Sequence, residues 1–369
     1  MKKICFIINA AGSMVVAKSV IEILRNKFQI LIIFSDALIA NKNFKSIKEK
    51  KIYYNNKTSS QKALKILKKI SPDLVFCGSN GNNFFELNFS EAACLLGIKT
   101  MTILDSWSYP LKRVQKKNKK KFNYLPLDLI GVPDIKTYQI LSKKRIYENK
   151  LFFAGLPQVG RTVVKFNSKN EKKIDKKNFN ILYISTPNEV PKKNDIKDGN
   201  EVFFNQKEII NTFLNVVNKI QKNKGVKINI FIKPHPSENK PFYVFINKQS
   251  KKYKQNLKIT LDKEKESFQS LLNKDCVIGI TSMMLIESIE CNKPTISLQF
   301  CDTFIKKKNY FKKIKNLTIC KNEDLLENHM IKIFNAKLHA NKLFKSVPKK
   351  YINFNKKIYS RINHLVDKR

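Results

Sequence analysis

Short apolar runs alternate with amphipathic stretches through the first 160 residues. A run of four to eight apolar residues between turn residues is typical of a buried strand, and an apolar stripe at helical spacing predicts a helix. The predicted strands are Ile4–Asn9, Gln29–Phe34, Leu74–Gly78, Lys99–Leu104, Leu129–Val132 and Leu151–Ala154. The predicted helices are Met14–Asn26, Ser60–Ile70 and Phe84–Leu96. This alternation predicts a parallel, doubly wound sheet.

A second alternating series follows the polar stretch Phe166–Lys177, which we interpret as an interdomain linker. Its predicted elements are strands at Asn180–Ser185, before His235 and at Leu257–Leu261, a helix near Gln206–Lys222, and a strand-helix-strand unit at Val277–Phe300. We therefore expect an α/β chain of two Rossmann-like, doubly wound domains facing a cleft. They cover residues 1–165 and 178–340, and residues 341–369 form helices that pack back toward the first domain.

The chain of 369 residues has a formal net charge of +43. Lysines supply nearly all of it and are scattered among Asn and Ile, which is typical of compositional drift in an AT-rich genome. The alternative is attraction to anionic lipid headgroups or a polyanionic acceptor, because a lysine near a membrane contributes about 1 kcal/mol. The lysine-dense segment Lys116–Lys121 is interpreted as a solvated loop, with such a contact as its alternative role. No nucleic-acid partner is expected, since no binding module has its signature here.

The seven cysteines include no CxxC pair, so the sequence indicates neither a disulfide framework nor a zinc site. The first residues resemble a signal peptide, but Asn9 and Ser13 interrupt the apolar run, which favours a strand and a turn. No run approaches the 18 or so apolar residues of a membrane span. We expect a cytoplasmic protein, with contact to the inner membrane face as an open alternative.

The most informative run is Ile228–Pro236, in which a short apolar stretch ends in Lys233, Pro234, His235 and Pro236. The two prolines exclude a helix and a continued central strand, so they predict a turn at the strand's end. Open α/β sheets bind their ligands at the carboxyl ends of their strands. His235 could therefore neutralise charge on a departing phosphate group, with assistance from Lys233. The alternative is a turn histidine bonded to local backbone.

A phosphate site is also predicted where the strand ending near Gly279 passes into a helix. Thr281 or Ser282 would cap this helix, and its free N–H groups would attract an anion. Glu287 lies about one and a half turns along, where its carboxylate could accept hydrogen bonds from a ribose diol. The plain alternative is an ordinary helix cap followed by a solvated glutamate.

These two windows resemble the C-terminal half of GT-B glycosyltransferases. The resemblance is greatest to bacterial surface-polysaccharide enzymes with a His-Pro motif, namely polysialyltransferases and the glycerophosphotransferases of teichoic acid synthesis. Such enzymes have a Ser/Thr pair, a helix with an acidic residue and a Lys-Pro turn, which correspond to Thr281–Ser282, Glu287 and Asn292–Pro294. Asn292 replaces the usual glycine, a substitution that a left-handed turn tolerates. The resemblance implies that His235, Thr281 and Ser282 contact donor phosphates and that Glu287 lies near the ribose.

The N-terminal half is similar to sugar-transferase relatives in outline, through Asp105–Tyr109, Leu125–Asp128 and Gly155–Pro157, although an inserted Leu127 breaks the usual Leu-Pro-Asp pattern. An inverting enzyme of this kind needs a base for the acceptor hydroxyl. Asp105, at the end of a predicted strand, is the first candidate for this catalytic role. Its rivals are Asp36 and Glu86, and the alternative role of Asp105 is an N-cap or an Asx-turn.

The predicted function is transfer of a sugar, or of a related alcohol phosphate, from a nucleotide-activated donor to a cell-surface glycan or a lipid-linked acceptor, as in capsule or lipopolysaccharide synthesis. The donor would be a nucleotide-sugar or a CDP-alcohol. The first domain would hold the acceptor and the second the donor. Neither a metal nor another cofactor is expected. Two alternatives stay open: a nucleotide-sugar 2-epimerase on the same fold, which needs further acid/base carboxylates and no acceptor, and a non-catalytic basic binding protein.

Overall fold

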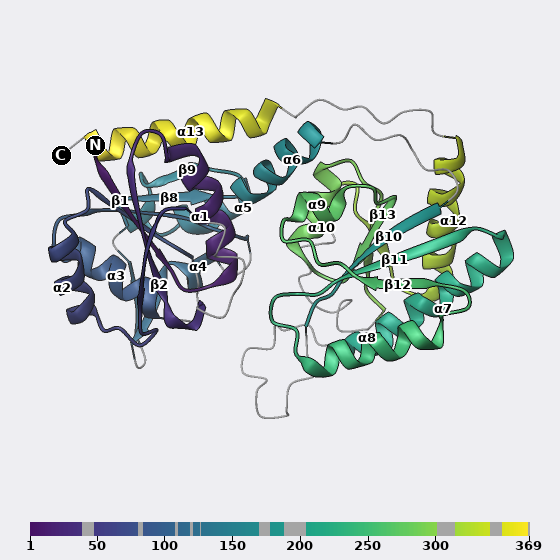
Figure 1. Ribbon diagram of the computed structural model, residues 1–369. Helices are drawn as coiled ribbons and strands as arrows, with labels where there is room; N and C mark the ends of the chain where they lie inside the picture. Colours follow the sequence, from purple (N-terminus) through teal and green to yellow (C-terminus); the bar gives the residue numbers. More distant parts are fainter. Residues whose placement is uncertain are drawn as a thin grey trace. The chain divides into compact units, whose positions relative to one another are not determined.

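The computed structural model describes residues 1–38, 48–79, 84–107, 110–118, 121–125, 127–169, 178–187, 204–300, 314–339 and 349–367. These residues divide into two compact units (Figure 1). Unit 1 comprises Met1–Arg161 and Pro348–Arg369, and unit 2 comprises Thr162–Val347.

Unit 1 is built on a parallel sheet with the strand order β3-β2-β1-β4-β5-β8-β9. Its strands are β1 (Lys3–Ile8), β2 (Gln29–Ser35), β3 (Lys50–Tyr54), β4 (Leu74–Cys77), β5 (Lys99–Ile103), β8 (Leu129–Val132) and β9 (Leu151–Phe153). Its helices are α1 (Ala11–Leu24), α2 (Ser60–Ile70), α3 (Phe84–Leu95), α4 (Pro110–Arg113), α5 (Ile135–Ser142) and α13 (Lys349–Asp367), with short turns η1 (Asp36–Leu38) and η3 (Arg145–Tyr147).

The central strand β1 faces two different apolar layers because side chains alternate between the faces of a sheet. Ile4, Phe6 and Ile8 pack against α1 and α13, whereas Cys5 and Ile7 pack against α2 and α3. Helix α13, the last part of the described chain, buries Ile358, Ile362 and Val366 in the unit 1 core. The ends of the chain therefore belong to one unit.

Unit 2 repeats this architecture with the strand order β12-β11-β10-β13-β14-β15, again all parallel. Its strands are β10 (Asn178–Ile184), β11 (Lys227–Lys233), β12 (Lys258–Leu261), β13 (Cys276–Gly279), β14 (Thr295–Leu298) and β15 (Thr318–Cys320). Its helices are α7 (Gln206–Lys224), α8 (Lys240–Lys252), α9 (Ser267–Leu271), α10 (Met283–Glu290) and α12 (Glu323–His339). Helices α7, α8 and α12 share one apolar core on one face of the sheet, and Figure 1 shows α9 and α10 on the other side.

Two interpretations of polar segments were wrong in part. The stretch Phe166–Lys177 was predicted to be a linker, but helix α6 (Pro157–Lys169) continues through its first four residues. The helix persists because Val159, Val163 and Phe166 form one buried stripe at helical spacing. Lys116–Lys121 was predicted to be a loop, yet β6 (Gln115–Asn118) and β7 (Lys121–Tyr124) pair as an antiparallel hairpin. Residues 119–120 and 170–177 lie outside the described residues.

Within the described part of the chain, no helix is both long enough and apolar enough to cross a bilayer.

Candidate active site

The carboxyl edge of the unit 2 sheet gathers the residues that the sequence singled out in this half. Ile184 of β10 is level with Lys233 of β11 on one side and with Gly279 of β13 on the other. The chain fills the sheet from β10 outward in one direction and then, from β13, in the other. A strand order that reverses in this way leaves a ligand crevice at the carboxyl ends of the strands beside the reversal. The loops after β10, β11 and β13 therefore border the position where a ligand is expected.

His235 is exposed and is held by hydrogen bonds on two sides. Its backbone N–H donates to Oγ of Ser185, across 2.7 Å, just after β10. The backbone N–H of Ser237 donates to Nδ1 of the His235 ring across 3.2 Å. An N–H group can only donate, so Nδ1 must accept, and the neutral ring then carries its proton on Nε2. Partial desolvation lowers the pKa of His235, and Glu238 offsets a part of this shift.

Lys233 directs its ammonium group toward the loop after β12. Its Nζ lies 3.7 Å from Oδ1 of Asp262 and donates to the backbone carbonyl of Glu264. Burial lowers the pKa of Lys233, and the carboxylates of Asp262 and Glu264 offset part of that shift. Its charge is thus already shared with Asp262, which leaves His235 as the stronger candidate for a contact with phosphate.

The N-terminus of α10 follows β13, as predicted. Ser282 is the N-cap, and its Oγ accepts the N–H of Met284 across 3.3 Å. Thr281 precedes the cap and is half-buried. The first N–H groups of a helix have no partner within the helix, so they attract anions. Two residues after β10, the buried hydroxyl of Thr186 has no hydrogen-bond partner among the described residues, which makes it a further available donor near this edge.

Glu287 is only 4% exposed, so the alternative interpretation of a solvated glutamate was wrong. It lies among the buried residues of α10 and raises the pKa of Cys291, together with the larger effect of burial on that thiol. The turn after α10 has the predicted left-handed residue, because Asn292 has φ of 58°. A ribose contact by Glu287 stays a prediction.

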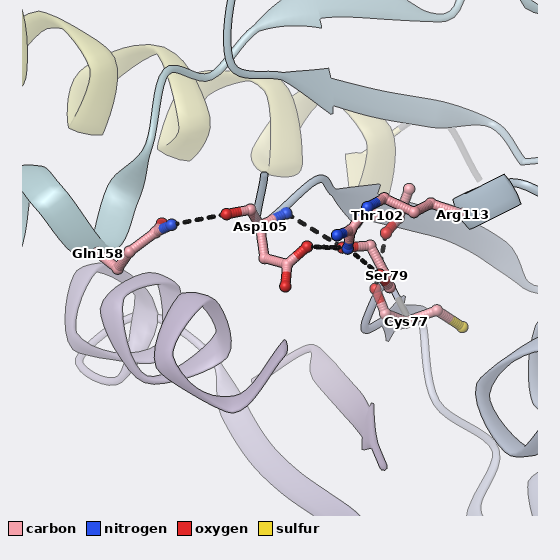
Figure 2. Close-up of polar contacts among 6 residues, drawn as sticks. All are labelled: Cys77, Ser79, Thr102, Asp105, Arg113 and Gln158. Carbon is pink, nitrogen blue, oxygen red and sulfur yellow. Dashed lines mark hydrogen bonds and ion pairs between the residues drawn. The ribbon is translucent and has the colours of Figure 1, made fainter. Parts of the chain in front are cut away.

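Unit 1 has a second polar group of residues at the carboxyl ends of β4 and β5 (Figure 2). Oδ1 of Asp105 accepts hydrogen bonds from Nη1 of Arg113 and from Oγ of Ser79, the latter across 3.0 Å. The same Arg113 nitrogen donates to the Ser79 carbonyl across 2.6 Å. The side chains of Asp105 and Arg113 are both 18% exposed. Arg113 therefore neutralises and orients the carboxylate, while the second oxygen of Asp105 has a different environment.

That second oxygen, Oδ2, lies beside the start of helix α1. A Cβ atom placed on Gly12 would lie 2.5 Å from it, so any side chain at this position would force the carboxylate to move. Nε2 of Gln158, on α6, donates to the Asp105 carbonyl across 2.9 Å. Three buried oxygens (Asn9 Oδ1, Ser13 Oγ and Gln158 Oε1) have no hydrogen-bond partner among the described residues. Partners from a hydroxyl-rich ligand would satisfy them.

The rival carboxylates have structural contacts of their own. Glu86 is fully buried, and its Oε1 accepts the N–H of Asn9 across 3.0 Å. Asp36 accepts the N–H of Asn56 across 2.9 Å. Asp128, from the Leu125–Asp128 window, accepts the N–H of Thr100 across 2.8 Å and so ties β8 to β5.

Sequence reasoning missed Arg113, Ser79 and Ser185. Ser79 and Ser185 lie far along the chain from the residues they contact, 26 residues from Asp105 and 50 from His235, whereas Arg113 lies 8 residues from Asp105. Ser79 and Ser185 each lie directly after an apolar run, and this position is the signal that could have indicated them. Arg113 has no comparable signal. Among the described residues, no three His, Cys, Asp or Glu side chains come together as metal ligands would. The expectation of a donor bound without a metal stays a prediction.

No protein-family model matches the sequence, and no curated protein sequence matches it. Solved structures do match over nearly the whole chain. S. aureus MnaA in a co-structure with UDP is 13% identical, with a TM-score of 0.64 over 100% of this chain and 97% of that chain. The UDP-GlcNAc 2-epimerase of Methanocaldococcus jannaschii is 16% identical, with a TM-score of 0.63 over 98% of this chain and 99% of that chain. Acinetobacter baumannii MurG is 12% identical, with a TM-score of 0.52 over 98% of this chain and 100% of that chain.

Identities this low establish the fold alone. The chain has the α/β fold of two Rossmann-like domains that GT-B proteins share, as the sequence predicted. The closer resemblance to polysialyltransferases and glycerophosphotransferases stays a prediction.

Proposed function

We propose that the protein is an enzyme that acts on a nucleotide-sugar, and that its reaction is the 2-epimerisation of a UDP-N-acetylhexosamine. The observation that carries the proposal is the donor set at the carboxyl edge of unit 2. His235, with its Nε2–H, follows β11, and the N-terminus of α10 follows β13. These two strands flank β10, so both donors lie at the same edge of the sheet. The fold likeness favours epimerisation, since the M. jannaschii 2-epimerase matches with a TM-score of 0.63 against 0.52 for MurG.

The first chemical step is the same for an epimerase and for a glycosyltransferase. The bond between the anomeric carbon and the diphosphate oxygen breaks, and the nucleoside diphosphate leaves with the electron pair. Negative charge then grows on the β-phosphate. Positioned donors stabilise this charge more in the transition state than in the substrate. His235 would donate through Nε2, and Thr281, Ser282 and the first N–H groups of α10 would bind the remaining oxygens.

The second step decides between the two reactions. In epimerisation, a base takes the proton from C2, and the electrons of that C–H bond form a double bond between C1 and C2 as the diphosphate departs. A proton then returns to C2 on the other face of the sugar, and a diphosphate oxygen re-forms its bond to C1. This requires carboxylates, and unit 1 has Asp105 and Glu86 near the ends of β1, β4 and β5. We propose Asp105 as the base, held by Arg113 and Ser79 so that Oδ2 receives the proton. The unpartnered oxygens of Asn9 and Ser13 fit the hydroxyl and amide groups of a hexosamine.

Glycosyl or alcohol-phosphate transfer is the second candidate, and the His-Pro and Thr-Ser motifs favour it. Asp105 would then take the proton of an acceptor hydroxyl, and the acceptor would be a glycan or a lipid-linked sugar. Glu287 near the ribose and Lys233 near the diphosphate are proposed for both reactions.

Exchange of the C2 proton separates the candidates. The full chain is incubated with UDP-N-acetylglucosamine in D2O and followed by proton NMR. An epimerase replaces the C2 proton by deuterium and forms the epimer with no acceptor present. A transferase leaves C2 protonated in the absence of an acceptor, and this result would exclude the epimerase. An Asp105→Asn variant that exchanges at the wild-type rate would remove Asp105 from the proposal.

A further inference from the structure

Helix α8 of unit 2 exposes lysine and apolar side chains without an acidic residue among them. From Lys240 to Leu261 the sequence has six lysines and neither Asp nor Glu. Phe242, Ile246 and Gln249 are the buried residues of the helix. The exposed positions cover the opposite half of the helix: Lys240, Pro241, Tyr243, Val244, Asn247, Lys248, Lys251 and Lys252. The helix is thus divided cleanly between a core face and a basic face.

The basic face has an apolar centre. Val244 is 59% exposed and Tyr243 is 37% exposed. Residues four apart lie on the same side of a helix, so Lys240 and Lys248 are the neighbours of Val244 along the axis. An amphipathic helix at a membrane surface has this composition, because apolar side chains enter the boundary of the acyl chains while lysine stems extend their charges to the phosphates.

A cavity of about 360 Å³ adjoins the C-terminal end of this helix. Ser250, in the last turn of α8, and Lys254, just after it, line one part of the cavity, and Lys227 and Lys258 line another. Three lysines around a cavity of this size can accept the phosphate of a lipid headgroup. The cavity lies at the amino ends of β11 and β12, so it is separate from the carboxyl edge that holds His235.

We propose that this part of unit 2 docks on an anionic phospholipid bilayer. The α8 surface, as we name it, consists of Lys240, Tyr243, Val244, Lys248, Lys251 and Lys252. Charge complementarity selects an anionic partner, and the exposed apolar centre selects a bilayer over a soluble polyanion. The assignment does not depend on the proposed reaction.

Helix α2 provides the matched control, because it exposes lysines without an apolar centre. Lys62, Lys65, Lys68 and Lys69 are all exposed, and the apolar residues of the helix are buried or half-buried. Binding that follows from the net charge of the chain alone would depend on α2 and α8 equally. Binding through the α8 surface depends on α8 only.

The test is co-sedimentation of the full chain with vesicles of phosphatidylcholine, alone or mixed with phosphatidylglycerol, at about 0.15 M salt. We expect binding only to the mixed vesicles. Because each lysine near an anionic surface contributes about fivefold, the triple variant K248Q/K251Q/K252Q lowers the affinity about a hundredfold. The control K62Q/K65Q/K68Q lowers it less than about threefold. The variant Y243S/V244S retains every charge and lowers it about tenfold, through the apolar area that no longer enters the bilayer.

Three results would overturn the proposal: no binding to the mixed vesicles, equal losses for the α2 and α8 triple variants, or wild-type binding by Y243S/V244S. Duplex DNA that binds through the α8 lysines and displaces the vesicles would instead show a nucleic-acid surface. Circular dichroism of each variant checks that the substitutions leave the fold intact.

Discussion

The backbone N–H of Ser237 donates to Nδ1 of His235 across 3.2 Å, and the Ser237 hydroxyl oxygen lies 2.7 Å from the same nitrogen. This pair assigns the neutral imidazole one tautomer, with the proton on Nε2. Nitrogen NMR of histidine-labelled protein at pH 7 should therefore show Nε2 protonated and Nδ1 bare. The chain has four histidines, and the signal that disappears in His235→Gln identifies the ring. A proton on Nδ1 would contradict the assignment.

Removal of the His235 donor should lower the rate more than the affinity. His235→Ala should reduce kcat about 100- to 1000-fold, the usual effect of losing one donor to a developing negative charge. His235→Gln keeps an amide N–H and should recover part of that loss. Steady-state kinetics with UDP-N-acetylglucosamine check this. A raised KM with an unchanged kcat would show that His235 binds the substrate without stabilising the leaving diphosphate.

The lowered pKa of His235 makes folding stability depend on pH in a defined direction. Below the unfolded value near 6.5, the unfolded chain binds a proton before the folded chain does. The free energy of unfolding therefore decreases as the pH falls from about 6.5 to the folded pKa, and the contribution of His235 is fully present above 6.5. Urea unfolding of the wild type and of His235→Gln at several pH values measures it. If the free energy of unfolding fell more steeply with decreasing pH in His235→Gln than in the wild type, the predicted sign would be wrong.

The ion pair of Asp105 and Arg113 should couple the two residues energetically. Both side chains are mostly buried, so Arg113→Met should cost about 1–3 kcal/mol, because the Asp105 carboxylate and the Ser79 carbonyl both lose the hydrogen bond that Arg113 donates. In a double-mutant cycle with Asp105→Asn, the double variant should lose less stability than the sum of the two single variants, by about 1 kcal/mol or more. Denaturant midpoints give these energies, and strict additivity would mean that the pair contributes nothing.

Gly12→Ala should impair the reaction through Asp105. The new Cβ would come within 2.5 Å of Oδ2, so the carboxylate must move. We expect kcat to decrease at least about tenfold while helix α1 is kept, since alanine favours helices. In an Asp105→Ala background, Gly12→Ala should cause no further loss of activity. A further loss of activity in that background would show that Gly12→Ala does not act through Asp105.

Much of the fold could be predicted because the local signals are strong. Helix α2 has the predicted bounds, since Ser59 caps it and Ser71 ends it in a left-handed conformation. Strand β3 was missed, because its five residues begin with two lysines and show no clear alternation of polar and apolar positions. It lies at the edge of the sheet, where it pairs with β2. Helix α6 was not predicted, and its last four residues were assigned to a linker because they are polar.

The candidate site was predictable only where one local segment defines it. The loop after β11 and the Ser282 cap depend on prolines, hydroxyls and strand ends that the sequence displays. The contacts Ser185–His235 and Ser79–Asp105 join separate loops. Each contact forms only because the strands before the two loops are neighbours in the sheet. Neither local sequence determines that strand order.

The central claim is that unit 2 binds a nucleoside diphosphate through His235 and the N-terminus of α10, and thermal unfolding with UDP tests it most directly. UDP at about 100 times its dissociation constant should stabilise the protein by about 2.7 kcal/mol. His235→Ala and Ser282→Ala should each abolish most of the shift. Ser59→Ala, which removes the cap of α2, and His364→Ala, on an exposed position of α13, should retain it. A shift that survives both site variants, or no shift with UDP at all, would contradict the account.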